Sequence, residues 1–121
     1  MQTQIIIFGT HPEKAKEVFN ALEQFQDWEV AAVTNVELVL EKMHRQSINM
    51  IVFTEGVSLI DENKLRKVGA ILNEEIVFLH HNGQNAIKPQ IVAALNRQRL
   101  EREAHYTILD DGLKQVSISL N

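Results

Sequence analysis

The run Gln4-Ile5-Ile6-Ile7-Phe8-Gly9-Thr10-His11-Pro12 sets the architecture of this chain. Its apolar residues are continuous rather than alternating, which is typical of a strand buried on both faces of a parallel sheet. Gly9 then permits a tight turn. Thr10 and Glu13 stand at capping-box spacing, so we predict that a helix begins near His11. The chain therefore opens with a strand, a turn and a helix.

The same alternation of strand and helix repeats along the chain. Further β-branched runs predict strands at Trp28–Val33, Asn49–Phe53 and Ile76–Leu79. Amphipathic stretches lie between them, with Thr34 and Asp61 as the predicted caps of the second and third helices. Strands that alternate with helices of this length indicate βα units and a parallel sheet covered on both faces. We therefore expect an α/β fold, a three-layer α/β/α sandwich.

The last part of the chain changes its pattern. Pro89 suits the first turn of a fourth helix, and the charged run 97–103 predicts the solvated end of that helix. From Tyr106 to Leu120, polar and apolar residues alternate around Asp110-Asp111-Gly112, which predicts a β-hairpin. We expect one domain over residues 1–121, with residues 105–121 as a hairpin extension. The two aspartates are assigned to the turn and not to catalysis.

Length and composition limit the classes of function. A chain of 121 residues, 45% hydrophobic and 23% charged, fits one folded domain. It has no cysteine, which excludes disulfides, thiolate metal sites and a cysteine nucleophile and fits a reducing cytoplasm. The net charge of −4 argues against binding to nucleic acid. Because no leader-like or membrane-spanning run is present, we expect a cytoplasmic protein that binds no membrane.

Four segments together resemble the signature positions of response-regulator receiver domains. They are residues 5–12 (IIIFGTHP), 49–54 (NMIVFT), 76–80 (IVFLH) and 87–89 (IKP). The resemblance covers about residues 4–104, and the Lys-Pro pair before the last helix is its most specific part. It implies a receiver-like, flavodoxin-like fold with a mainly parallel sheet in strand order 2-1-3-4.

The resemblance also implies that the phosphoryl chemistry of receivers is lost. The family uses an acidic pair after the first strand to hold magnesium, and an aspartate at the end of the third strand to accept the phosphoryl group. Gly9, Thr10 and Thr54 occupy these positions, and they do not replace the carboxylate ligands that magnesium requires. His80 stands at the position of the family's switch hydroxyl, whereas Lys88 matches the family's lysine. We expect a pseudo-receiver without the phosphoacceptor aspartate.

The chain also departs from the family pattern in length. Only about eight residues separate His80 from Lys88, which is too few for the family's fourth helix and fifth strand. Their deletion would expose an edge of the sheet. We expect the hairpin at residues 106–120 to cover this edge, either on its own subunit or on a neighbour.

Side chains that follow the strands of a parallel sheet meet at one rim, where ligands bind. The candidate rim consists of Gly9, Thr10, His11, Thr54, Glu55, His80, His81 and Lys88. Its histidines with Glu55 would suit zinc or nickel, but adjacent strand residues point to opposite faces. The turn before the first helix would suit a phosphate, but Pro12 removes one donor. We predict no metal site, no cofactor and no catalytic residue.

The leading interpretation is a non-catalytic, regulatory module of signalling. It would bind a protein partner or a second copy of itself, as a homodimer, through the sheet edge, the tail or the last helix. The alternative is a domain that binds a small ligand or a metal at the rim. Thermal stabilisation by ligands distinguishes the two, because a ligand that prefers the native state raises its apparent stability.

Overall fold

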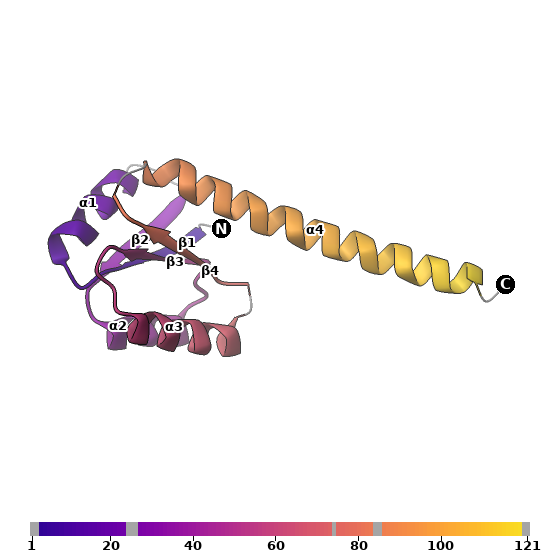
Figure 1. The fold of residues 1–121 in the computed structure, drawn as a ribbon, viewed down its shortest axis with the longest axis horizontal. Coiled ribbons are helices and arrows are strands. Elements are labelled where there is room, and N and C mark those ends of the chain that lie inside the picture. Colours follow the sequence, from indigo (N-terminus) through magenta and orange to yellow (C-terminus); the bar gives the residue numbers. More distant parts are fainter. Residues whose placement is uncertain (1–2, 24–26, 74, 84–85, 120–121) are drawn as a thin grey trace.

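Strands and helices alternate through the chain, as the sequence predicts. The computed structural model describes residues 3–23, 27–73, 75–83 and 86–119, with side chains as far as residue 104. The elements are β1 (Thr3–Phe8), α1 (Pro12–Leu22), β2 (Trp28–Val33), α2 (Val36–Arg45), β3 (Met50–Thr54), α3 (Leu59–Leu72), β4 (Val77–His81) and α4 (Ile87–Ser119). The strands form one parallel sheet in the order β2-β1-β3-β4 (Figure 1). The predicted fold class and strand order are confirmed.

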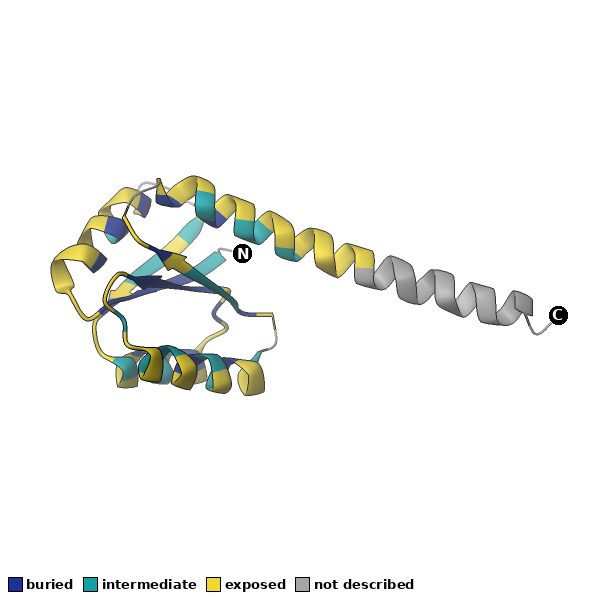
Figure 2. Cartoon of the chain, in the orientation of Figure 1, coloured by how far each residue is buried: buried dark blue, intermediate teal, exposed yellow. Residues whose placement is uncertain are grey.

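Two apolar layers hold the sheet between its helices. One layer joins the sheet to α2 and α3 and is built around Phe8, Phe53 and Leu65. The other joins the opposite face to α1 and α4 and contains Leu22 and Ile91. The inner strands β1 and β3 contribute to both layers and are buried along most of their length (Figure 2). The continuous apolar runs of these two strands follow from this two-sided burial.

The helix caps differ from the predicted ones, which were Thr10, Thr34 and Asp61. The Asn35 side chain caps α2 by accepting a hydrogen bond of 2.8 Å from the Glu37 N–H. The Ser58 hydroxyl caps α3 by accepting one of 3.1 Å from the Asp61 N–H. At α1 the N-cap is His11, which makes no side-chain capping bond. Proline at the first helical position keeps the preceding residue extended, and so sets the cap one residue later than predicted.

Helix α4 is long and leaves the core after its first turns. Ile87 and Ile91 are buried against the sheet, and Pro89 lies in the first turn, as predicted. The Gln98 side chain then donates to the backbone carbonyl of Glu75, just before β4. Beyond this contact the helix runs past the end of the sheet (Figure 1), and residues 101–104 are exposed.

The hairpin predicted for residues 106–120 is wrong, because residues 106–119 continue α4; residue 120 lies outside the described residues. The preceding segment is rich in alanine, leucine, arginine, glutamine and glutamate, which favour helix. A glycine such as Gly112 costs a helix only about 1 kcal/mol relative to alanine and does not stop it. Within the described residues, no helix combines the length and the apolarity needed to cross a bilayer.

The connection between β4 and α4 is short. β4 ends at His81 and α4 begins at Ile87, so no helix and strand are inserted there, as the sequence spacing predicts. β4 is consequently the last strand in the sheet order. Because the hairpin is absent from residues 106–119, it does not cover this edge.

Candidate functional site

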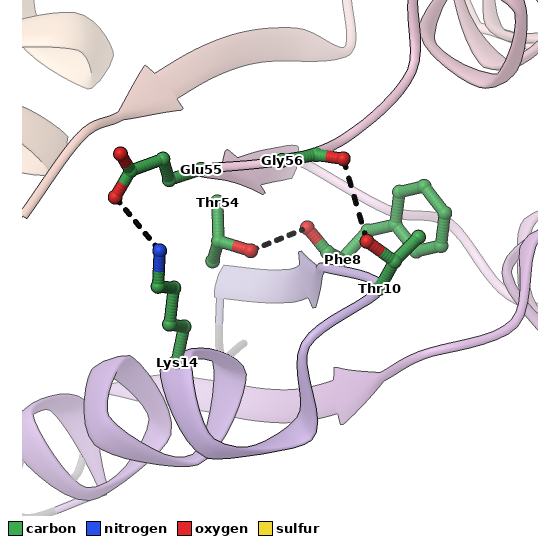
Figure 3. Close-up of polar contacts among 6 residues, drawn as sticks. All are labelled: Phe8, Thr10, Lys14, Thr54, Glu55 and Gly56. Atoms are coloured by element: carbon green, nitrogen blue, oxygen red, sulfur yellow. Dashed lines mark hydrogen bonds and ion pairs between the residues drawn. The ribbon is translucent and has the colours of Figure 1, made fainter.

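The carboxyl ends of β1, β3 and β4 bring most of the predicted rim residues together. Gly9 and Thr10 follow β1, Thr54 ends β3, and His80 and His81 end β4. Figure 3 shows the Thr54 side chain directed to the end of β1 and the Glu55 side chain directed to the start of α1. Lys88 is exposed in the first turn of α4 and does not line the hollows at this rim.

The Thr54 side chain fills the space next to Gly9. It is 5% exposed, and its hydroxyl donates to the Phe8 carbonyl over 3.4 Å (Figure 3). A Cβ atom added at Gly9 would lie 1.9 Å from Thr54 Oγ1, far closer than van der Waals contact. Position 9 therefore has no room for any side chain, and no carboxylate fits there, while Thr54 keeps this rotamer.

Glu55 is bound by a lysine that the sequence analysis did not single out. Lys14 Nζ donates to Glu55 Oε2 at 2.9 Å (Figure 3). This hydrogen bond and the positive charge of Lys14 lower the pKa of Glu55 below its ordinary value. Lys14 lies in the first turn of α1, so its position near the end of β3 follows from βα geometry, which was a usable signal. Glu55 is thus ionised and already paired with Lys14.

The turn after β3 closes over the turn after β1. The Thr10 hydroxyl donates to the Gly56 carbonyl over 3.4 Å (Figure 3). Gly56 has a φ of +96°, a conformation that favours glycine, and a Cβ there would lie 2.7 Å from His11 Nε2. The His11 ring therefore rests against this glycine, so Thr10 and His11 hold the two loops together.

The adjacent histidines of β4 lie on opposite faces of the sheet. His81 is buried, and its Nδ1 lies 2.7 Å from Oε1 of Gln90 in α4. His80 is exposed on the other face, where its Nε2 lies 3.1 Å from Glu62 Oε2 in α3. Among the described residues, no three histidine, aspartate or glutamate side chains lie close enough together to hold a metal ion. The pair does not converge on one ligand.

Two small hollows flank the rim. One, of about 110 Å³, lies between α1 and β4 and is lined by Lys14, Thr54 and His81. The other, of about 210 Å³, lies on the side of Val57 and His80. Pockets for drug-sized ligands usually measure about 300–1,000 Å³, so each hollow taken alone is smaller than such a pocket; the two share Thr54, Glu55 and His81 in their lining. A larger hollow, of about 600 Å³, lies between β2 and α2 and includes Val33, whose carbonyl accepts a hydrogen bond of 3.2 Å from the Gly9 N–H.

A polar cluster lies next to β4, on the face of the sheet that packs against α3. The Arg66 guanidinium carbon lies 5.0 Å from the ring centre of Phe78 and 5.8 Å from that of Phe53. These rings stack on each other with centres 5.8 Å apart. Glu62 accepts hydrogen bonds from Arg66 Nε at 2.8 Å and from the His80 ring at 3.1 Å. Arg66 therefore covers the aromatic pair on this face of the sheet.

This cluster was not predicted, although the sequence held one signal for it. Glu62 and Arg66 stand four residues apart in the predicted third helix, a spacing that favours an ion pair. Burial tends to raise the pKa of Glu62, but the hydrogen bonds from Arg66 and His80 and their charges outweigh it, so the pKa lies below its ordinary value. Glu62 is consequently ionised at neutral pH and holds the other two side chains.

We expect the contribution of Glu62 to stability to depend on pH. Because its folded-state pKa is lowered, its charge stabilises the fold above the ordinary pKa, and this stabilisation is lost as the pH falls through the folded-state value. Glu62→Gln keeps the shape and removes the charge. The difference in melting temperature between wild type and Glu62→Gln should shrink between about pH 5 and pH 3. A difference that stays constant over this range would show that the carboxylate charge is not what matters.

The comparisons with known proteins support the fold alone. Among solved structures, the chain is similar to the crystal structure of the signal receiver domain of a protein described as a Luxo repressor, from Vibrio parahaemolyticus. The sequences are 13% identical, the TM-score is 0.53, and the match covers 86% of this chain and 98% of that one. No family model and no curated protein sequence matches the chain. The receiver-like architecture is thus confirmed at the level of fold.

Proposed function

We propose that this chain is a receiver-like module of signalling that accepts no phosphoryl group and acts by associating with another protein chain, a second copy included. The contact between Gly9 and Thr54 carries the proposal. A receiver needs carboxylates at both places, whereas here a buried threonine occupies the space of one missing side chain and replaces the other. The similarity of fold to a signal receiver domain supports the assignment to signalling.

The electrostatics of the rim also argue against magnesium-dependent phosphoryl transfer. Magnesium takes oxygen ligands and is bound in proteins mainly through carboxylates. Glu55 is the one carboxylate that follows β3 directly, and it already pairs with Lys14. The Thr54 hydroxyl donates to a backbone carbonyl, and the side chain is buried. The hydroxyl is therefore not exposed to a phosphoryl donor in solution.

Exposed apolar side chains support a role in binding other chains. Leu59 and Ile60 at the start of α3 are 70% and 80% exposed, and Ile71 near its end is 83% exposed. Leu100 on α4 is 58% exposed. Leu59 and Ile60 are adjacent in the sequence, and neighbouring exposed apolar side chains offer a surface for contact with another protein.

A melting experiment tests the proposal. The melting temperature should stay unchanged when magnesium and beryllofluoride, an analogue of the phosphoryl group, are added together, because Gly9, Thr10 and Thr54 stand where receivers have the carboxylates that bind them. A receiver domain that binds both serves as the positive control. A rise that requires both additions would contradict the proposal. A rise with another metal or a nucleotide would instead favour the alternative, a ligand-binding rim.

A further inference from the structure

The outer edge of β4 presents unpaired backbone groups. The Val77 N–H donates to the Asn49 carbonyl at 3.0 Å, so Val77 faces the neighbouring strand β3. Successive residues of a strand direct their N–H and C=O groups to alternate sides. Leu79 and His81 therefore also face β3, and Phe78 and His80 direct theirs outward. Since β4 is the last strand in the described sheet, these outward groups have no strand to pair with.

This edge lacks the usual protection against pairing. Edge strands are commonly guarded by charged residues, especially lysine, or by proline or a bulge. β4 reads Val-Phe-Leu-His-His and contains none of these residues, and its pairing with β3 runs without a bulge. The opposite edge strand, β2, carries the exposed charged residue Glu29 at its second position. The two edges of the sheet are thus different, and β4 is the one suited to accept a strand.

We propose that β4 pairs antiparallel with β4 of a second copy, with Phe78 opposite His80 of the partner subunit. This rests on the proposed function and names the surface and the partner. About a two-fold axis at Leu79, each Phe78–His80 pair exchanges both of its N–H···O bonds. Every outward N–H and C=O of the two edges then finds a partner, and two parallel sheets join into one. The set of outward groups is therefore complementary to itself, as an isologous interface requires.

The side chains match in the same register. Leu79 lies on the α4 side of the sheet and meets Leu79 of the partner subunit across the axis, an apolar pair. Phe78 lies on the α3 side, as does His80, whose ring stands 5.4 Å from that of Phe53. Aromatic side chains directly opposite each other across a pair of strands stabilise a sheet. Both faces of the joined strands thus carry favourable neighbours.

Helix α4 leaves room beside the edge. An open groove of about 270 Å³ runs along residues 76–79 and is bounded on the α4 side by Ala94, Arg97 and Glu101. The small side chain of Ala94 allows a second copy to approach closely, and the opposite charges of Arg97 and Glu101 on this side cancel. Bringing the α4 flanks of two copies together therefore adds no surplus of like charge.

Proline substitution tests the pairing with little disturbance of the fold. His80→Pro removes an N–H that faces the open edge, and proline is tolerated at such positions. In the dimer the change removes one hydrogen bond at each of two symmetric places, so the dimer dissociation constant should rise roughly 30-fold. His80→Ala is the matched control, since it removes the same imidazole and keeps the N–H. Sedimentation velocity of the full chain over a concentration series gives the dimer dissociation constant of the wild type, His80→Pro and His80→Ala.

Amide hydrogen exchange of the wild type gives a second measurement that needs no variant. The N–H groups of Phe78 and His80 should exchange more slowly as the protein concentration rises. The N–H of Leu79 already faces β3, so its exchange rate should change much less with concentration. A wild-type chain that stays monomeric, or a dimer that His80→Pro and His80→Ala weaken equally, would overturn the β4 pairing. Neither result touches the proposed function, which fails instead if the rim takes up magnesium and a phosphoryl group.

Discussion

Gly9→Ala is expected to lower the free energy of unfolding by about 2–3 kcal/mol, near the upper end for overpacking a core. The new methyl group would start 1.9 Å from Thr54 Oγ1, and the threonine is buried. Gly9 is not among the residues with positive φ, so the backbone itself tolerates alanine. The whole cost therefore comes from the contact. Urea unfolding measures it, provided that the slope with denaturant is unchanged.

The same contact predicts that Thr54→Ala rescues the variant in part. Removing Oγ1 leaves the Thr54 Cβ as the nearest atom, 3.2 Å from the new methyl group, which is tight but tolerable. Gly9→Ala/Thr54→Ala should be more stable than the sum of the single changes by about 1–2 kcal/mol. Strict additivity would show that Thr54 does not occupy the space beside residue 9.

Phe53→Ala is expected to destabilise the fold by about 3–5 kcal/mol, a large share of the roughly 5–15 kcal/mol typical of a domain. Phe53 is 1% exposed and contacts rings on both sides. Its centre lies 6.5 Å from Phe8, edge to face, and 5.8 Å from Phe78, stacked. The Arg66 guanidinium loses one of its two aromatic faces as well. The change thus opens a cavity under the polar cluster.

Ile71→Ala is the matched control for this prediction. Ile71 is 83% exposed on α3, so removing a large apolar side chain there should change stability by less than about 0.5 kcal/mol. Denaturant midpoints of both variants test the pair. Similar losses from both would contradict the assignment of the core to the Phe53 layer.

The inner strands β1 and β3 were predictable because burial on both faces leaves a continuous apolar run, and the edge strands β2 and β4 because their β-branched and aromatic residues favour strand. Trp28–Val33 matches its prediction at both ends, and β1, β3 and β4 differ from theirs by a residue or two. The helix caps were less predictable, since several polar residues precede each helix and the backbone at Pro12 or Asn35 decides which one caps. The hairpin failed because alternation over residues 106–120 competes with a helix already under way, which extends at little cost.

The rim was also predictable only in part. Its membership followed from the rule that parallel strands end at one edge, and this placed Gly9, Thr54 and His81 near one another. What each side chain binds did not follow, because the partners come from helices. Lys14 in α1 is 41 residues from Glu55 in the sequence, and Gln90 lies in α4, 9 residues after His81. The close approach of Gly9 and Thr54 also depends on how β1 and β3 pair, which pattern alone does not reveal.

The central claim is that this receiver-like fold accepts no phosphoryl group, and intact-mass spectrometry tests it most directly. The full chain is incubated with magnesium and acetyl phosphate, beside a receiver domain that takes up the phosphoryl group under the same conditions. We predict that the mass of this chain stays unchanged while that of the control rises by one phosphoryl group. A mass increase that maps to Thr54, Glu55 or another residue of the rim would contradict the account.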